Sequence, residues 1–217
     1  IYGGVEREVI DERTSMAANN PYGVAKLYGH LMARVYRDSF GMFVASGILF
    51  NHESPRRGLH FVSRKVTMAA ACIKRGVIDP PLDESGQSLV MDGKVTLGNL
   101  DALRDWGYAP EYVEAMWKML QQPTPKDYII ATNTLYSVRD LCRVAFEHVG
   151  LNWEEHVDAS ERFLRLTEIT ASRGDYSLAE RELGWKPRTR FEDLVRTMVD
   201  ADMRRLETGV RWRGPGS

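Results

Sequence analysis

The sequence contains few cysteines, almost no net charge and no long apolar run, and each shortage excludes a class of protein. Cys72 and Cys142 are its two cysteines, and they form no CxxC pair, so neither a disulfide framework nor a zinc site is indicated. The formal charge of −1 gives no reason to expect non-specific binding to nucleic acid or to an anionic membrane. No apolar run approaches the length of a bilayer span, and the N-terminus lacks a signal pattern. We therefore expect a cytoplasmic protein that binds neither nucleic acid nor membrane.

What the sequence does contain is typical of a globular α/β chain. Hydrophobic residues make up 43% of its 217 positions and charged residues 27%, enough for one sizeable core with or without a small lobe. Asn20 and Pro21 predict the N-cap and first position of a helix, which is expected to end at Gly41. Residues 42–50 are nearly all apolar and predict a strand buried on both faces of a parallel sheet.

The apolar spacing predicts further elements, with a surface insertion at 79–94 and a disordered tail at 207–217. The expected elements are helices at 61–75, 110–120, 137–149, 177–183 and 191–206, and a strand at 128–131. Several large apolar residues are expected in the core, namely Trp106, Trp117, Trp185, Met116 and Met119.

One pair of residues has a spacing that suits acid–base chemistry. Tyr22 and Lys26 stand four residues apart, so both side chains project from the same face of the predicted helix. A free phenol has a pKa of about 10, and a neighbouring ammonium lowers that pKa because it stabilises the phenolate. The alternative is that Tyr22 packs in the core and Lys26 is solvated.

Polar residues follow the strand predicted at 42–50. Ligands of open α/β sheets bind beyond the carboxyl ends of the strands, which is where Asn51 and His52 fall. Arg56 and Arg57 come next, and guanidinium groups bind phosphate in a bidentate manner. The alternative for the two arginines is a solvated loop.

Several segments together resemble GDP-mannose 4,6-dehydratase, a family of the extended short-chain dehydrogenase/reductase superfamily. The resemblance covers nearly the whole chain apart from the insertion and the tail. The segments are "NPYGVAKLYGH", "GILFNHESPRRG", "FVSRKVT", "LGNLDALRDWGYAPEYVEAMWKMLQQ" and "ELGWKP". "FNHESPRRG" and "LGNLDALRDWG" are specific to the family, whereas Tyr-x-x-x-Lys is shared by the superfamily.

The resemblance implies an NADP-dependent lyase that converts GDP-mannose to GDP-4-keto-6-deoxymannose in a redox-neutral cycle, within nucleotide-sugar metabolism. It implies that Tyr22 is the acid–base residue at the C4 hydroxyl, and that Lys26 lowers its pKa and binds the nicotinamide ribose. His52 and Arg57 match NADP contacts of the family. A homo-oligomer is also implied for the complete enzyme.

The resemblance also implies four contacts with the nucleotide sugar. Asn51 and Lys65 match residues near the diphosphate, and Arg104 matches an arginine of the sugar-nucleotide pocket. Arg64 competes with Lys65, and the sequence leaves open which of the two points inward. Arg165 matches the arginine of an Arg-Pro-x-Glu motif, although this chain has Leu166 in place of the proline.

The family's glycine-rich loop for the dinucleotide pyrophosphate is absent from this sequence. "IYGG" resembles the family segment directly after its catalytic Thr and Glu, so we expect the chain to be a C-terminal part that is inactive alone. Residues 1–58 are then expected to complete a Rossmann-type dinucleotide-binding domain. Residues 59–206 are expected to form mostly a helix-rich GDP-sugar-binding lobe. Within this range, a strand and a helix at about 127–149 are candidates to belong to the sheet of the dinucleotide-binding domain.

Two alternatives to a dehydratase remain open from the sequence. One is a related GDP-sugar epimerase or reductase. The other is a short non-catalytic protein that binds a nucleotide sugar.

Overall fold

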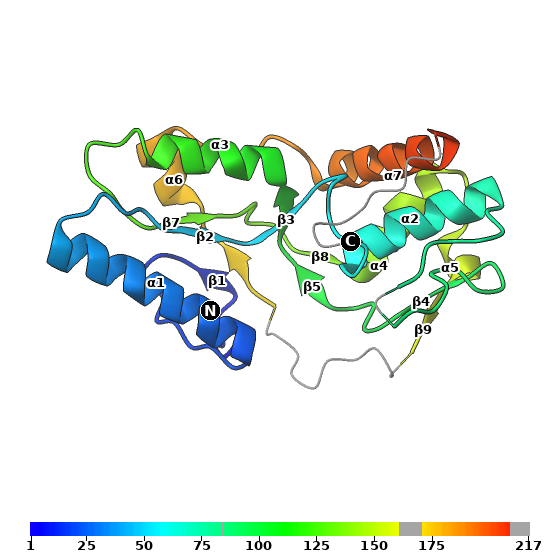
Figure 1. The fold of residues 1–217 in the computed structure, drawn as a ribbon, viewed down its shortest axis with the longest axis horizontal. Helices are drawn as coiled ribbons and strands as arrows, with labels where there is room; N and C mark the ends of the chain where they lie inside the picture. The colour runs from blue at the N-terminus through cyan, green and yellow to red at the C-terminus, as the bar shows by residue number, and fades with distance from the viewer. Residues whose placement is uncertain (84, 161–170, 209–217) are drawn as a thin grey trace. The chain divides into compact units, whose positions relative to one another are not determined.

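A computed structural model describes residues 1–83, 85–160 and 171–208 (Figure 1). The chain divides into two compact units. Unit 1 comprises Ile1–His52, Leu103–Leu135 and Arg165–Arg188, and unit 2 comprises Glu53–Ala102, Tyr136–Leu164 and Thr189–Ser217. Both units contain helices and strands, so the predicted α/β class is confirmed. Within the described ranges, no helix combines the length and the apolar character needed to cross a bilayer.

The strands of unit 1 are short, and its helices are longer. The strands are β1 (Val9–Ile10), β2 (Gly47–Leu49), β3 (Asn51–Glu53, which ends in unit 2), β5 (Leu103–Arg104), β6 (Trp106–Tyr108), β7 (Tyr128–Ile130) and β10 (Arg173–Gly174). The helices are α1 (Pro21–Phe40), α3 (Ala109–Met119) and α6 (Ser177–Leu183).

Parallel strand pairs form the sheet layer of unit 1. β1 pairs with β10, and β2 pairs with β7 in a register that places Ile48 opposite Ile129. Successive residues of β7 enter cores on opposite faces, as a strand period of two requires. Tyr128 and Ile130 lie in one cluster, and Ile129 lies in the other. Both faces of β7 are therefore buried.

Helices line the two faces of this sheet in Figure 1, with α3 and α6 on one side and α1 on the other. The side of α3 and α6 is well filled, because Trp185 packs edge-on against Tyr112 with ring centroids 5.9 Å apart. Gly184 has φ +58° and ends α6 in the left-handed conformation that glycine adopts without strain. The predicted helix 177–183 is confirmed residue for residue.

The strand predicted at 42–50 is wrong in its length and in its burial. Only Gly47–Leu49 forms β2, since β7 offers hydrogen-bonding partners over just three residues. Met42 and Phe43 are about half exposed, at 51% and 46%. The apolar run thus predicted a nine-residue strand, whereas the described residues pair with it over Gly47–Leu49.

Helix α1 begins and ends as predicted, but its apolar face is exposed. Asn20 is the N-cap and accepts a hydrogen bond from Gly23 N at 2.8 Å, and Gly41 ends the helix with φ +64°. Among its 20 residues, Gly23 is the buried one. Apolar side chains along it remain accessible, namely Tyr22, Val24, Tyr28, Leu31, Val35, Tyr36 and Phe40. Helical periodicity therefore predicted the element without predicting what covers it.

Two residues predicted in the core are also exposed. Trp117 is 62% exposed and Met116 40%, and Val113 of the same helix and its C-cap Leu120 are exposed as well. Trp106, Trp185 and Met119 are buried as predicted.

Unit 2 is built on three helices that contact one another, α2 (Val62–Arg75), α4 (Val138–His148) and α7 (Phe191–Thr208). Its other elements are β4 (Val95–Leu97), β8 (Tyr136–Ser137), α5 (Trp153–His156) and β9 (Val157–Ala159), and β4 pairs with β9 in parallel. Ser137 caps α4 as predicted, in a capping box with Asp140. α7 continues to Thr208, so the prediction of disorder is wrong for residues 207 and 208, and 209–217 lie outside the described residues.

Candidate functional site

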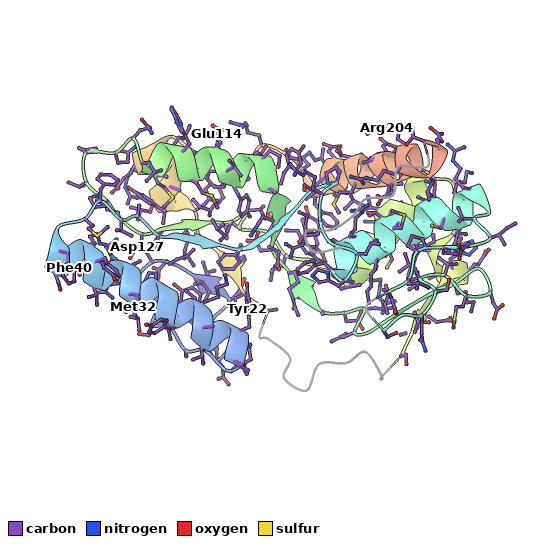
Figure 2. All side chains as sticks on the ribbon, viewed as in Figure 1. Tyr22, Met32, Phe40, Glu114, Asp127 and Arg204 are labelled. Carbon is purple, nitrogen blue, oxygen red and sulfur yellow. The ribbon has the colours of Figure 1, made fainter. Side chains whose placement is uncertain are left out.

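Tyr22 and Lys26 lie on the same face of α1, as their spacing predicts. The Lys26 Nζ is 5.4 Å from the centroid of the Tyr22 ring. The ring is 73% exposed, so no core of the described residues covers it, contrary to the packing alternative. Figure 2 shows Tyr22 at the first turn of the helix, at the opposite end from Phe40. The structure thus presents a phenol beside an ammonium at a surface of unit 1.

The first turn of α1 is fixed by local hydrogen bonding and close packing. Asn20 caps the helix, and Pro21 supplies the φ angle of its first residue. Gly23 lies against Ala18, where an added Cβ would stand 3.3 Å from the alanine Cβ. This turn therefore holds the Cα atoms of Tyr22 and Lys26 in a defined position.

Asn51 and His52 are half-buried on β3, directly after β2. The Asn51 Nδ2 donates to the backbone oxygen of Asp105 at 3.2 Å. The His52 Nδ1 lies 2.8 Å from the carbonyl oxygen of Phe50, which can only accept, so Nδ1 carries the proton and Nε2 of a neutral ring is an acceptor. The His52 ring also lies 5.5 Å from the Tyr112 ring. Both predicted site residues are thereby oriented by unit 1.

Asp105 joins three segments of unit 1, and the sequence reasoning missed it. Its Oδ1 accepts from the backbone N and the Oγ1 of Thr132 at 2.8 and 2.7 Å. Its Oδ2 accepts from the backbone N of Asn133 at 2.9 Å and of Gly174 at 3.1 Å. Burial raises the pKa of Asp105, and the hydrogen bonds from Thr132, Gly174 and Asn133 oppose that rise. The signal in the sequence is a carboxylate directly before the apolar Trp106 in "LRDWG".

Arg104 ends β5 directly before Asp105, and its Nη1 donates to the carbonyl oxygen of Leu103 at 2.7 Å. Its neighbour Asp105 is 1% exposed and accepts four hydrogen bonds, so the backbone at this position is anchored. The structure therefore places Asn51 and Arg104 on segments that Asp105 connects.

Arg57 belongs to unit 2 and has two neighbours there. Its Nε lies 3.2 Å from Glu53 Oε2, and its guanidinium carbon lies 3.4 Å from the centroid of the Phe61 ring. The side chain keeps 22% of its surface accessible, and the adjacent Arg56 is exposed. The loop thus presents two guanidinium groups, one oriented by its neighbours and one in solvent.

Arg64 and Lys65 are separated by their surroundings. The Arg64 side chain is 1% exposed and forms an ion pair with Asp202 at 2.6 Å. A guanidinium held in this way does not reach a ligand. Lys65 is also buried, at 8% exposure. Arg64 is therefore a core residue of unit 2 and not a ligand contact. Arg165 lies outside the described residues.

The known proteins that this chain resembles in structure define its fold. The protein RMD from Pseudomonas aeruginosa, solved with NADPH, superposes with a TM-score of 0.77 at 19% identity, over 90% of this chain and 60% of that one. The dTDP-glucose 4,6-dehydratase of Bacillus anthracis, solved with NAD, superposes with a TM-score of 0.75 at 15% identity, over 93% and 58%. The fold is therefore the Rossmann-like α/β fold that these two proteins share.

Sequence comparison narrows the class to one family. A family model described as GDP-mannose 4,6 dehydratase matches residues 1–198. "GDP-mannose 4,6 dehydratase 1" of Arabidopsis thaliana is 45% identical over 192 residues, which are 88% of this chain and 49% of that protein. The chain belongs to the GDP-mannose 4,6-dehydratase family, and it spans about half the length of this relative.

Proposed function

We propose that the protein containing this chain converts GDP-mannose to GDP-4-keto-6-deoxymannose and water, with NADP as a cofactor that is regenerated in each cycle. The observation that supports this most strongly is the family match over residues 1–198, which includes every residue proposed below. The local geometry of Tyr22, Lys26, Asn51 and His52 is compatible with their proposed roles.

Tyr22 is proposed to exchange a proton with the C4 hydroxyl of the mannose. An acid–base group must be accessible to substrate, and the Tyr22 ring is 73% exposed in this chain. Lys26 stands one helical turn away, where its positive charge stabilises the phenolate. The rigid start of α1 keeps the two groups in register.

The chain supplies donors and acceptors that fit part of NADP. Lys26 and His52 Nε2 are suited to ribose hydroxyls and a carboxamide, and Arg57 to a phosphate. The sequence has no glycine-rich loop for the pyrophosphate, so these residues fit the cofactor in part. Lys26, His52 and Arg57 would hold part of the cofactor, which would supply the hydride acceptor for C4 and the hydride donor for C6.

The nucleotide sugar is proposed to be held by Asn51, Lys65, Arg104 and Arg165. Cations and an amide are the groups that bind a diphosphate and a sugar hydroxyl. Asn51 is fixed by the backbone oxygen of Asp105, so its amide is preorganised for a ligand. We assign the GDP-sugar lobe to 59–206 and the remaining dinucleotide-binding part to 1–58.

The test is a product analysis on protein expressed from the complete open reading frame. Incubation with GDP-mannose and catalytic NADP should give the 4-keto-6-deoxy product, with the added NADP unchanged at the end. NADPH released in proportion to product, or a C4 epimer, would contradict the dehydratase proposal and favour a GDP-sugar reductase or epimerase. A protein that binds GDP-mannose without converting it would support the non-catalytic alternative.

A further inference from the structure

Arg64 and Asp202 form a fully buried ion pair in unit 2, with side chains 1% and 0% exposed. The Arg64 Nε lies 3.0 Å from both carboxylate oxygens, and its Nη2 lies 2.6 Å from Oδ1. Two further donors reach the same carboxylate, Thr67 Oγ1 at 2.8 Å and Arg205 Nη1 at 2.9 Å. The charge of Asp202 is therefore compensated from several directions.

A buried ion pair of this kind needs an explanation other than stability. The desolvation of two charges offsets most of their attraction, and apolar replacements of equal volume are often neutral or stabilising. The pair does, however, fix the Arg64 guanidinium in one orientation, with Nη1 turned away from the carboxylate. The contacts of Nη1 therefore show what this fixed orientation positions.

Nη1 of Arg64 binds the backbone of the loop 54–58. It donates to the carbonyl oxygens of Pro55 at 3.1 Å and of Arg57 at 2.7 Å. Arg205 Nη2 donates to the same Pro55 oxygen at 2.6 Å. The buried pair therefore sets the path of the segment that carries Arg56 and Arg57.

The rest of the loop is held by shorter-range contacts. Arg57 N donates to Ser54 O at 3.0 Å, and Phe61 N donates to Gly58 O at 3.2 Å. Glu53, at the start of the loop, accepts from Ser63 Oγ and forms the ion pair with Arg57. These contacts close a turn, and Arg64 connects that turn to the core of unit 2.

We propose that Arg64 and Asp202 are positioning residues that hold the loop 54–58 in the shape needed to present its two arginines to a phosphate of the cofactor. This inference rests on the proposed function, since it takes Arg57 as a cofactor contact. Neither residue touches the ligand. They act through the carbonyl groups of Pro55 and Arg57.

A matched pair elsewhere on the same two helices provides the control. Arg75 of α2 and Glu207 of α7 also form an ion pair, but their side chains are 41% and 51% exposed, and the ion pair lies at the other end of α2 from the loop. If Arg64 and Asp202 only joined α2 to α7, removing either ion pair would accelerate amide exchange in the same regions, and the two effects would differ only in size. A positioning role predicts a local effect on 54–61.

The experiment measures amide hydrogen exchange, without ligand, in protein from the complete open reading frame. Arg64→Met combined with Asp202→Leu should keep a normal unfolding transition while exchange at residues 57–61 accelerates roughly 10- to 100-fold, because two hydrogen bonds to the loop are lost. Glu207→Gln should leave this segment unchanged. Unchanged exchange at 57–61 in a folded double variant would overturn the proposal.

A second variant covers the case in which the double variant fails to fold. Arg64→Lys keeps the charge opposite Asp202, but a single ammonium cannot reproduce the fork that reaches both the carboxylate and the two carbonyls. It should also accelerate exchange at 57–61, and exchange as slow as in the wild type would again overturn the proposal.

Cofactor binding separates this inference from the proposed function. The variants should weaken NADPH binding about 10-fold or more and raise by a similar factor the NADP concentration needed for half-maximal turnover, with kcat at saturating NADP changed less, while Glu207→Gln binds NADPH normally. A wild-type protein that does not bind NADPH would contradict the proposed function, and the ligand-free exchange result would still decide whether Arg64 and Asp202 order the loop. If the variants exchange faster at the loop but bind NADPH as tightly as the wild type, the proposal that the loop presents its arginines to the cofactor would be overturned.

Discussion

Asp105 shows how one buried charge can organise a site at the residue scale. Its carboxylate accepts hydrogen bonds from Thr132, Asn133 and Gly174, while its backbone oxygen accepts from Asn51. Gly174 can approach this closely because it has no Cβ, which would stand 2.4 Å from Ala131 Cβ. The predicted ligand contacts Asn51 and Arg104 therefore depend on a residue that need not touch a ligand.

Asp105→Asn should lower the free energy of unfolding by about 2–4 kcal/mol. The amide NH₂ would face backbone N–H groups where the carboxylate accepted them, and each buried unsatisfied donor costs about 1–3 kcal/mol. Urea unfolding measures the difference. Asp101→Asn is the control, because Asp101 is 76% exposed and its pair with Arg139 contributes little. Equal stability of the two variants would contradict the role given to Asp105.

Tyr22→Phe should lower kcat about 10²- to 10⁴-fold in protein from the complete open reading frame, because it removes the proton that an acid–base group transfers. The KM for GDP-mannose should change far less. Tyr28→Phe is the matched control, since Tyr28 is 65% exposed on the same helix. Steady-state kinetics of both variants decide the matter, and a Tyr22→Phe enzyme with normal turnover would remove the catalytic assignment.

At the scale of elements, α1 is attached to the sheet through charged groups near its C-terminal end. Arg37 Nη1 and Nη2 donate to the two carboxylate oxygens of Asp127 at 2.7 and 3.1 Å, just before β7. Figure 2 shows Asp127 beside this part of α1. Burial acts to raise the pKa of Asp127, but Arg37, with a smaller contribution from His30, holds that pKa below its usual value.

The lowered pKa of Asp127 predicts a loss of stability in acid. A carboxylate whose pKa is depressed in the folded state stabilises the protein above its unfolded pKa of about 3.9, and this stabilisation is lost as the pH falls through the folded pKa. Arg37→Met should therefore cost about 1.5–3 kcal/mol at pH 7 and make the decline below about pH 4 shallower. Urea unfolding between pH 2 and 7 measures both effects.

Arg34→Met is the control for this pair, since Arg34 lies one turn earlier on α1 and is exposed, whereas the Arg37 side chain is 17% exposed. It should leave the free energy of unfolding and its dependence on pH nearly unchanged. An Arg37→Met variant with the same acid profile as the wild type would show that the ion pair does not depress the pKa of Asp127.

At the scale of the whole molecule, unit 1 leaves much apolar surface uncovered by the described residues. The exposed row on α1 includes Tyr28, Leu31 and Val35, and α3 exposes Trp117. Within the described part of the chain, β2 pairs with β7 along one edge. Uncovered apolar faces and open strand edges both promote association.

Residues 1–217 expressed alone should therefore associate in solution and show no turnover of GDP-mannose. Light scattering and a product assay test the two statements. Replacing Tyr28 and Val35 with glutamate should reduce association, whereas glutamate at the exposed polar position Gln121 should not. A monodisperse monomer that converts GDP-mannose would contradict the expectation that the chain needs further sequence.

The sequence by itself determined the features that depend on neighbouring residues. The helix starts at Asn20 and Ser137 and the helix end at Gly184 were predicted correctly, because capping uses side chains and φ angles within a few positions. The same holds for Tyr22 and Lys26, whose spacing alone places them on one face. The family followed from motifs that are contiguous in sequence.

Only the tertiary structure decided which groups are buried and which partners they have. Asp105 meets Gly174 across 69 positions, and Arg64 meets Asp202 across 138. Periodicity cannot report contacts at such separations, because they depend on how the chain closes on itself. For the same reason an apolar spacing marked Trp117 and residues 42–50 as core, although burial requires a covering element that local sequence does not specify.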